Sequence, residues 1–375
     1  MDGTFQAPSK EEYDELEEKD RKRSGLSSDL TMSQGRRHND GRNGIMNIKE
    51  DVLPYDQTRV LLETPINGVD YINASWVQKV KEMNVYEDVY EFLSTSKMNF
   101  ILTQDPTKDT GQHFYQMIFE QNIDVIVHIG TDQKTPKWKK QSYGNISKEL
   151  VERTVLQNDI VRETIDIFVK HGRAIHEHRS MVYHFTTWPS DNNFSDKDSD
   201  SLLTLITLVQ RDIGKPSNEL TVAVHDPSGG VEGASSFIVV LQMVQELDTK
   251  LKVRKQELLD GTGKTEKESI NLYDKVDELR KTRAHVVSTF SNYQFLLSTL
   301  AYYAKNKSKF DIMFKNASAI GEDATFLGNS RNLENRVSRE NGSTELIDEE
   351  DEIEYVLSDD APDNEMDYDS DIYVN

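Results

Sequence analysis

The sequence predicts an α/β or α+β domain built on one central sheet, and three observations support this. Short apolar runs with strand character alternate along the chain with longer segments of helical periodicity. One such run leads through a glycine-rich turn into an apolar segment, the pattern of a buried strand followed by a helix N-terminus. The chain has 375 residues and is 36% hydrophobic, enough for one large domain or two smaller ones.

The individual elements follow from the period of their apolar residues. Runs of four to six residues, rich in β-branched and aromatic side chains, predict strands at 100–103, 125–129, 164–168, 182–187 and 220–224. Apolar residues at helical spacing predict helices at 111–120, 202–210, 236–246, 270–283 and 293–304. Their mixed order favours a single sheet with helices packed against it.

Composition changes mark the domain boundaries. Residues 1–45 are polar and charge-mixed, which predicts a flexible leader with a short helix near 11–22. The folded body is expected to span 46–316, with an insertion at about 247–269 that forms a helix extension and a surface loop. Between Thr344 and Asn375 there are 14 acidic residues and no lysine or arginine, so 317–375 is expected to be a disordered acidic tail.

Charge and composition exclude several functional classes. A net charge of −22 argues against nucleic acid as a direct partner. The chain has no cysteine, which excludes disulfides, thiolate metal sites and cysteine-based catalysis. The N-terminus lacks an apolar signal-peptide core, and no apolar run approaches the ~20 residues of a membrane span. These features predict a chain without a membrane span.

The most informative stretch is 222–233, VAVHDPSGGVEG. A strand that delivers a glycine-rich turn to a helix N-terminus makes a cradle of N–H groups suited to a phosphate. This cradle contains two acids, Asp226 and Glu232, together with Gly229 and Gly230. Carboxylates repel a phosphate, so the two acids are incompatible with the phosphate binding that the shape of the loop otherwise favours.

Seven segments follow one another in a colinear series and resemble one known family. They are 51–60 (DVLPYDQTRV), 70–75 (DYINAS), 102–118 (LTQDP, Thr110 and FYQMI), Lys139 with Tyr143, 186–189 (TTWP), 222–233 and 289–294. Over about residues 46–305 they resemble the protein tyrosine phosphatase domain of the phosphotyrosine-specific kind. The resemblance implies a twisted mixed sheet flanked by helices on both faces.

The resemblance also implies which residues should carry the chemistry, and these are replaced. The nucleophile position holds Asp226 instead of cysteine, and the phosphate-binding arginine position holds Glu232. The general acid position holds Ser190, with Asp191 one residue late. The position of the tyrosine that stacks on phosphotyrosine aligns with Lys49 or Ile48, and the two glutamines that position water align with Ser288 and Asn292. His225, which precedes the loop, is expected to be a structural histidine.

These replacements predict a pseudophosphatase that acts as a regulatory or scaffolding domain. The pattern resembles the inactive, membrane-distal second domain of a receptor-type tyrosine phosphatase. The resemblance implies a cytoplasmic location, either as a separate product or as the intracellular part of a receptor. Expected partners are proteins, either an active phosphatase domain or its substrates, and no cofactor or metal is expected. The alternatives are a phosphatase with residual activity through Asp226 or Asp191, and a phosphotyrosine trap, against which Glu232 argues.

Other motifs in the sequence have both a functional and a simpler interpretation. Three acid-flanked tail tyrosines, Tyr355, Tyr368 and Tyr373, fit kinase substrates, and phosphorylated Tyr373 would resemble the motif that adaptor SH2 domains bind. The spacing of His171, His176 and His178 fits no zinc pattern and predicts a solvated turn. Residues 261–265 lack the first glycine of a P-loop, and the basic run 250–255 is expected to be a solvated helix face.

Overall fold

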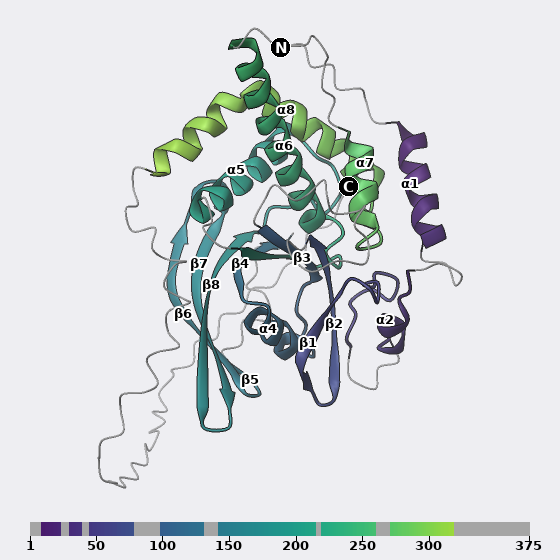
Figure 1. Ribbon diagram of the computed structural model, residues 1–375, viewed down its shortest axis with the longest axis vertical. Helices are drawn as coiled ribbons and strands as arrows, with labels where there is room; N and C mark the ends of the chain where they lie inside the picture. The colour runs from purple at the N-terminus through teal and green to yellow at the C-terminus, as the bar shows by residue number, and fades with distance from the viewer. Residues whose placement is uncertain are drawn as a thin grey trace, which may run out of the picture. The chain divides into compact units, whose positions relative to one another are not determined.

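A nine-stranded sheet in the strand order β1-β2-β3-β9-β4-β8-β7-β6-β5 forms the centre of the fold (Figure 1). The four strands β3, β9, β4 and β8 run parallel, and the outer strands pair antiparallel. The strands are β1 (Arg59–Ile66), β2 (Val69–Gln78), β3 (Met98–Gln104), β4 (Ile123–Ile129), β5 (Ser142–Tyr143), β6 (Ile146–Val155), β7 (Val161–His171), β8 (Ala174–Phe185) and β9 (Leu220–Asp226).

The structure is a computed structural model, and it describes residues 9–23, 30–39, 45–78, 98–130, 142–214, 219–259 and 271–318. All of these ranges belong to one structural unit, Met1–Ser330. The expected acidic tail, 317–375, lies almost wholly outside the described residues. Within the described part of the chain, no helix combines the length and apolarity needed to cross a membrane.

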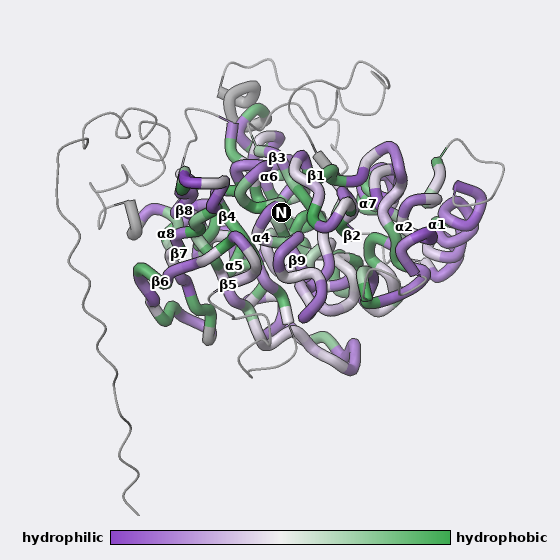
Figure 2. The backbone as a smooth tube through the Cα atoms, turned by 90° about the horizontal axis from the view of Figure 1, so that it is seen from below, coloured by the Kyte–Doolittle hydropathy of each residue, from purple (hydrophilic) through white to green (hydrophobic). Residues whose placement is uncertain are grey.

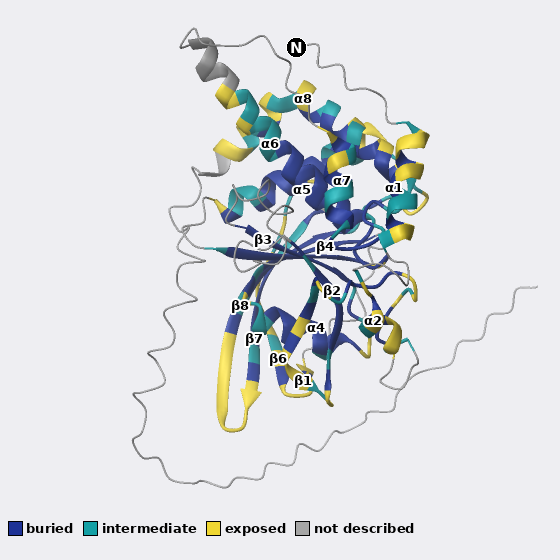
Figure 3. Ribbon diagram, turned by 45° about the vertical axis from the view of Figure 1, so that its right-hand side comes forward, coloured by how far each residue is buried: buried dark blue, intermediate teal, exposed yellow. Residues whose placement is uncertain are grey.

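Helices pack on both faces of the sheet, as predicted (Figure 3). On one face, α5, α6, α7 and α8 enclose the larger core with Phe100 and Leu102 of β3; on the other face, α4 places Met117 and Ile118 against Ile101. Alternate residues of β3 therefore serve opposite cores, as strand geometry requires. The helices are α1 (Lys10–Arg23), α2 (Ser33–Arg37), α4 (Gly111–Glu120), the 3-10 turn η2 (Gln157–Asp159), α5 (Asp196–Ile213), α6 (Gly233–Leu259), α7 (Leu272–Arg280) and α8 (Phe290–Ser318).

Every strand and helix predicted from periodicity is present, although the ends differ. The expected strand 182–187 ends at Phe185, and the helix expected from residue 293 begins at Phe290. The insertion at 247–269 starts as the expected helix extension, because α6 continues to Leu259. Periodicity did not indicate β1, β2, β5 or β6. In β1 the buried Val60 and Leu62 are separated by an exposed leucine, Leu61, and β6 is exposed over most of its length.

The structure corrects the prediction that the short helix near 11–22 belongs to a flexible leader. The short helix expected near 11–22 is α1, but it does not lie apart from the fold: Tyr13, Leu16 and Asp20 are buried. Tyr13 Oη donates to the Val287 carbonyl over 3.2 Å, and Asp20 accepts the N–H of His285 at 2.9 Å. The helix is hydrophilic over most of its length (Figure 2), so its composition is like that of a flexible segment and does not reveal the buried residues.

Candidate functional site

The loop that follows β9 forms a tight cradle at the N-terminus of α6. Gly229 and Gly230 adopt left-handed conformations with φ of 94° and 79°. A Cβ at Gly230 would lie 2.8 Å from the carbonyl oxygen of Thr103, so only glycine permits this approach to β3. The loop N–H groups are thereby turned inward, toward the start of the helix.

The Asp226 carboxylate occupies this cradle. Its Oδ1 accepts hydrogen bonds from the backbone N–H of Ser228 (2.9 Å), the Ser228 hydroxyl (2.7 Å) and the N–H of Gly230 (2.6 Å). Its Oδ2 accepts the N–H groups of Glu232 (3.2 Å) and Ala234 (2.9 Å). The side chain of Asp226 is buried, with 2% of the residue exposed.

This geometry resolves the contradiction read in the sequence. Donors that could surround a phosphate at a helix N-terminus instead surround an anion that is part of the chain. Hydrogen bonds to a charged acceptor are stronger than neutral ones, and here five converge on one carboxylate. The cradle is therefore filled as well as electrostatically opposed to phosphate.

Glu232 stands beside this carboxylate at the mouth of the loop. Burial and the neighbouring charge of Asp226 raise the pKa of Glu232 above its ordinary value, against the opposing effect of Lys49. Lys49 Nζ lies 3.7 Å from Glu232 Oε1, and the Ser288 hydroxyl contacts the same oxygen at 3.5 Å. The structure thus brings together three of the positions predicted from sequence, Glu232, Lys49 and Ser288. An acid stands at the centre of this group, whereas a phosphate clamp has a cation there.

Asn292 joins the same cluster from α8. Its Nδ2 lies 3.4 Å from the Glu232 carbonyl oxygen, and its Oδ1 accepts the hydroxyl of Ser236 at 2.9 Å. The N–H of Ser288 donates to the carbonyl of Val231 over 3.1 Å. Ser288 and Asn292 are thus held to the loop by its backbone and by a helix hydroxyl.

The predicted acid positions remain apart from this cluster. Ser190 and Asp191 are exposed, and Asp191 Oδ1 accepts the N–H of Asn193 at 3.0 Å. Trp188, just before them, is buried and packs edge-on against Phe194 and Phe295. Among the described residues, no hydrogen bond joins Asp191 to the cradle.

The sequence did not single out Arg283, which supports the cradle from behind. This arginine is fully buried and donates to the carbonyl of Gly229 at 2.6 Å, to Asn73 Oδ1 at 2.7 Å and to Ser75 Oγ at 2.9 Å. Burial lowers its pKa to about 10. Since it lies in a basic segment beside Lys281, sequence alone did not distinguish it from an exposed arginine.

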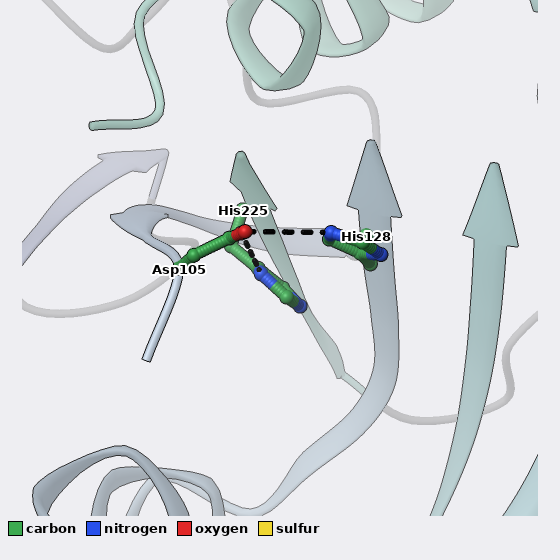
Figure 4. A group of neighbouring side chains, drawn as sticks. All are labelled: Asp105, His128 and His225. Atoms are coloured by element: carbon green, nitrogen blue, oxygen red, sulfur yellow. Dashed lines mark hydrogen bonds and ion pairs between the residues drawn. The ribbon is translucent and has the colours of Figure 1, made fainter. Parts of the chain in front are cut away.

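A second polar cluster lies beneath the loop, formed by Asp105, His128 and His225 (Figure 4). His225 Nδ1 is 2.7 Å from Asp105 Oδ1, and His128 Nε2 is 3.5 Å from Asp105 Oδ2. Burial lowers the pKa of His225. Burial opposes ionisation of Asp105, but hydrogen bonds with His128 and His225 outweigh it and hold the pKa of Asp105 well below its usual range.

The histidines of the β7–β8 hairpin are not all in a solvated turn, which corrects one expectation. His171 and His176 are exposed, but His178 is buried and its Nε2 lies 2.8 Å from the Ile123 carbonyl. The described residues contain one group with metal-ligand geometry, the cluster of Asp105, His128 and His225.

Several predicted features lie outside the described residues and stay predictions. They are the phosphorylation sites at Tyr355, Tyr368 and Tyr373, the segment 261–265, and Lys139 of the family motif series.

Comparisons with known proteins agree with the fold. Over 265 residues the chain is 29% identical to human receptor-type tyrosine-protein phosphatase alpha, covering 67% of this chain and 28% of that protein. Over 294 residues it is 27% identical to mouse receptor-type tyrosine-protein phosphatase eta, covering 75% of this chain and 20% of that protein. The chain thus spans about a fifth to a quarter of the length of these relatives.

Solved structures show the same fold. The catalytic domain of human protein tyrosine phosphatase non-receptor type 18 superposes with a TM-score of 0.58 at 21% identity, over 78% of this chain and 94% of that one. The family model for protein-tyrosine phosphatase matches residues 43–302, which include every strand of the described sheet and the loop between β9 and α6. The chain therefore belongs to the protein-tyrosine phosphatase family.

Proposed function

We propose that this chain is a catalytically inactive phosphatase domain that regulates or scaffolds phosphotyrosine signalling. The observation that supports this is the carboxylate of Asp226, which accepts five hydrogen bonds within the cradle. Both oxygens of the residue at the nucleophile position are engaged by the loop, so neither is presented to a substrate phosphorus.

Electrostatics also oppose a phosphate at this site. Asp226 and Glu232 place two acids where a dianion would have to sit, and Lys49 contacts one of them at 3.7 Å. At an effective dielectric near 20, each pair of unit charges about 4 Å apart is worth about 4 kcal/mol. Repulsion of this size supports exclusion of phosphotyrosine rather than its capture without hydrolysis.

The proposed partners are proteins in the cytoplasm. Solved structures of the type 18 phosphatase include one in complex with phosphopeptides of HER2, and that binding belongs to that protein. For this chain, with its cradle filled, we propose that partners bind elsewhere, either an active phosphatase domain or its substrates. An adaptor SH2 domain at phosphorylated Tyr373 is the proposed partner of the acidic tail.

The test measures phosphotyrosine peptide binding and phosphate release by the full chain in one titration. Wild type is expected to show neither, because the cradle holds Asp226. The double variant Asp226→Ser/Glu232→Arg removes the internal anion and restores a bidentate cation, so it is expected to bind the peptide at least tenfold more tightly than wild type. Thermal unfolding of both proteins checks that the variant is folded.

Either of two results would overturn the proposal. Phosphate release by wild type that disappears in Asp226→Ala would show residual phosphatase activity through this carboxylate, and release lost in Asp191→Ala would assign it to the shifted acid position.

A further inference from the structure

The parallel core of the sheet brings three metal-ligating side chains to one edge. His128 in β4 is paired with His225 in β9, and His225 is paired with Thr103 in β3. Asp105 follows β3 directly, and its N–H donates to the carbonyl of Asp226 at 2.9 Å. Because the carboxyl ends of parallel strands meet at one edge, residues far apart in sequence become neighbours.

The ligand atoms of this cluster are close to the separation that a metal requires. One nitrogen from each histidine and one oxygen of Asp105 all lie within 4.8 Å of one another. In a tetrahedral zinc site with bonds of about 2.0 Å, neighbouring ligand atoms are about 3.3 Å apart. Asp105 makes its two contacts through different oxygens, Oδ1 to His225 Nδ1 at 2.7 Å and Oδ2 to His128 Nε2 at 3.5 Å. The side chains must therefore turn to bring one oxygen and both nitrogens around a single ion.

The cluster lies in a largely buried part of the fold. His225 is fully buried and His128 nearly so, while the Asp105 side chain is 19% exposed and gives the cluster a route to solvent. The two imidazole rings stack with centroids 4.8 Å apart (Figure 4). The ring of His128 also packs edge-on against His184, whose Nε2 contacts a Glu163 carboxylate oxygen at 3.0 Å. This contact orients the ring of His184, which in turn packs against His128.

The backbone of Gly130 comes close to the donor nitrogen of His128. A Cβ placed on Gly130 would lie 3.0–3.1 Å from Cε1 and Nε2 of His128. Among the residues that the structure describes, it would meet no other heavy atom within 4 Å outside Gly130 and its chain neighbours. The absence of a side chain at Gly130 therefore avoids a close contact with the donor nitrogen, and the fourth ligand of the proposed site is a water, as in zinc sites with three protein ligands.

We propose that Asp105, His128 and His225 form a binding site for one divalent transition metal, with Zn²⁺ as the cation that this donor set fits best. Two imidazoles and one carboxylate match the ligand preferences of zinc, whereas Mg²⁺ and Ca²⁺ prefer oxygen ligands alone. Binding would exchange the carboxylate–imidazole contacts for three metal bonds and tie together the ends of β3, β4 and β9 beneath the cradle. The site does not use Asp226 and so stands independently of the proposed function.

The test uses the full chain after removal of metals with a chelator. Titration with Co²⁺ is expected to give the intense visible absorption of four-coordinate cobalt at one equivalent. Carboxylates of the acidic tail would give only the weak absorption of octahedral cobalt. Calorimetry with Zn²⁺ measures the affinity, and thermal unfolding with and without Zn²⁺ reports stabilisation by the metal.

Two ligand variants and one matched control decide the result. Asp105→Asn and His128→Gln are each expected to abolish the cobalt spectrum and to weaken Zn²⁺ binding by about 100-fold or more, since even residues behind a ligand contribute 10- to 100-fold. The exposed control His176→Gln is expected to bind as wild type does. Thermal unfolding without metal shows whether each variant is folded.

Two outcomes would overturn the proposal. The first is a wild-type protein that gives neither the cobalt spectrum nor zinc binding. The second is binding that survives in both folded ligand variants, or that is lost in His176→Gln, which would place the metal at the exposed hairpin histidines.

Discussion

The carboxylate of Asp226 is an anion that belongs to the chain and occupies a loop shaped to bind an anion. An aspartate side chain is long enough to reach the loop N–H groups, and its two oxygens divide five donors between them. Glu232 adds a second acid, and Lys49 and Ser288 contact that acid from two other segments. Both acids thus have specific partners in the structure.

The first residue-scale prediction concerns Asp226→Asn. The amide keeps the size of the side chain but turns an NH₂ group toward loop donors, so at least one pair of N–H groups loses its acceptor. We expect the free energy of unfolding to fall by about 3 kcal/mol, given 1.5–3 kcal/mol for a hydrogen bond to a charged group. Urea unfolding measures it, and the exposed Asp191→Asn should change stability by about 0.5 kcal/mol or less. An unchanged midpoint for Asp226→Asn would contradict the filled cradle.

The second residue-scale prediction concerns Glu232 and the pH dependence of the free energy of unfolding. Its pKa in the folded protein is raised above the ordinary 4.5 by burial and by Asp226. Between the unfolded and folded pKa values the native state binds more protons, so stability falls as pH rises through that window. Glu232→Gln removes this loss. Its stability relative to wild type should therefore increase from pH 4.5 upward and then level off.

Urea unfolding at a series of pH values measures this difference. Glu50→Gln, an exposed acid on the segment that carries Lys49, serves as the control. A Glu232→Gln difference that is independent of pH would show that the carboxylate is not electrostatically strained.

At the scale of elements, α1 is the informative case. A helix rich in charged residues is held by a narrow buried stripe, with Leu16 fully buried and Tyr13 packed against Phe290 and Tyr293. The carbonyl of Val287 accepts a hydrogen bond from the Tyr13 hydroxyl. The N–H of Val287 donates to the hydroxyl of Ser235, at the start of α6, over 3.1 Å. The helix is therefore connected to the element that carries the cradle.

The element-scale prediction is that Leu16→Ala destabilises the whole domain. Removing a fully buried leucine costs 2–5 kcal/mol in other cores, and we expect about 3 kcal/mol here. The midpoint of urea unfolding measures it, with the exposed Glu11→Ala on the same helix as the control. If residues 1–45 were a flexible leader, the two variants would unfold alike.

At the scale of the whole molecule, the replaced positions come from segments far apart in the chain and still meet. Lys49, the loop 226–233 and the pair Ser288 and Asn292 converge on one cluster, while Ser190 and Asp191 stay outside it. Restoring the family residue at one of these positions would leave the others unsuited to phosphate binding. A domain with this pattern retains its scaffold because the core residues, not the site residues, hold the sheet together.

Much of the fold could be predicted from sequence. The strands of the parallel core are continuous apolar runs because both of their faces are covered, and such runs are easy to recognise. The strands β1 and β6 were missed because their exposed residues, such as Leu61 and Leu150, interrupt any regular alternation. The buried stripe of α1 was missed because three buried residues do not change the composition of a charged segment.

The sequence by itself determined the family motifs, the loop between β9 and α6, and the identity of the acids at positions 226 and 232, since these depend only on residue type and spacing. Tertiary structure decided what those acids do. Hydrogen-bond direction turns the Asp226 carboxylate into the cradle, and parallel pairing of three strands brings Asp105 and His128 to His225. Both outcomes depend on side chains meeting across strand register and loop curvature, which residue spacing along one segment does not specify.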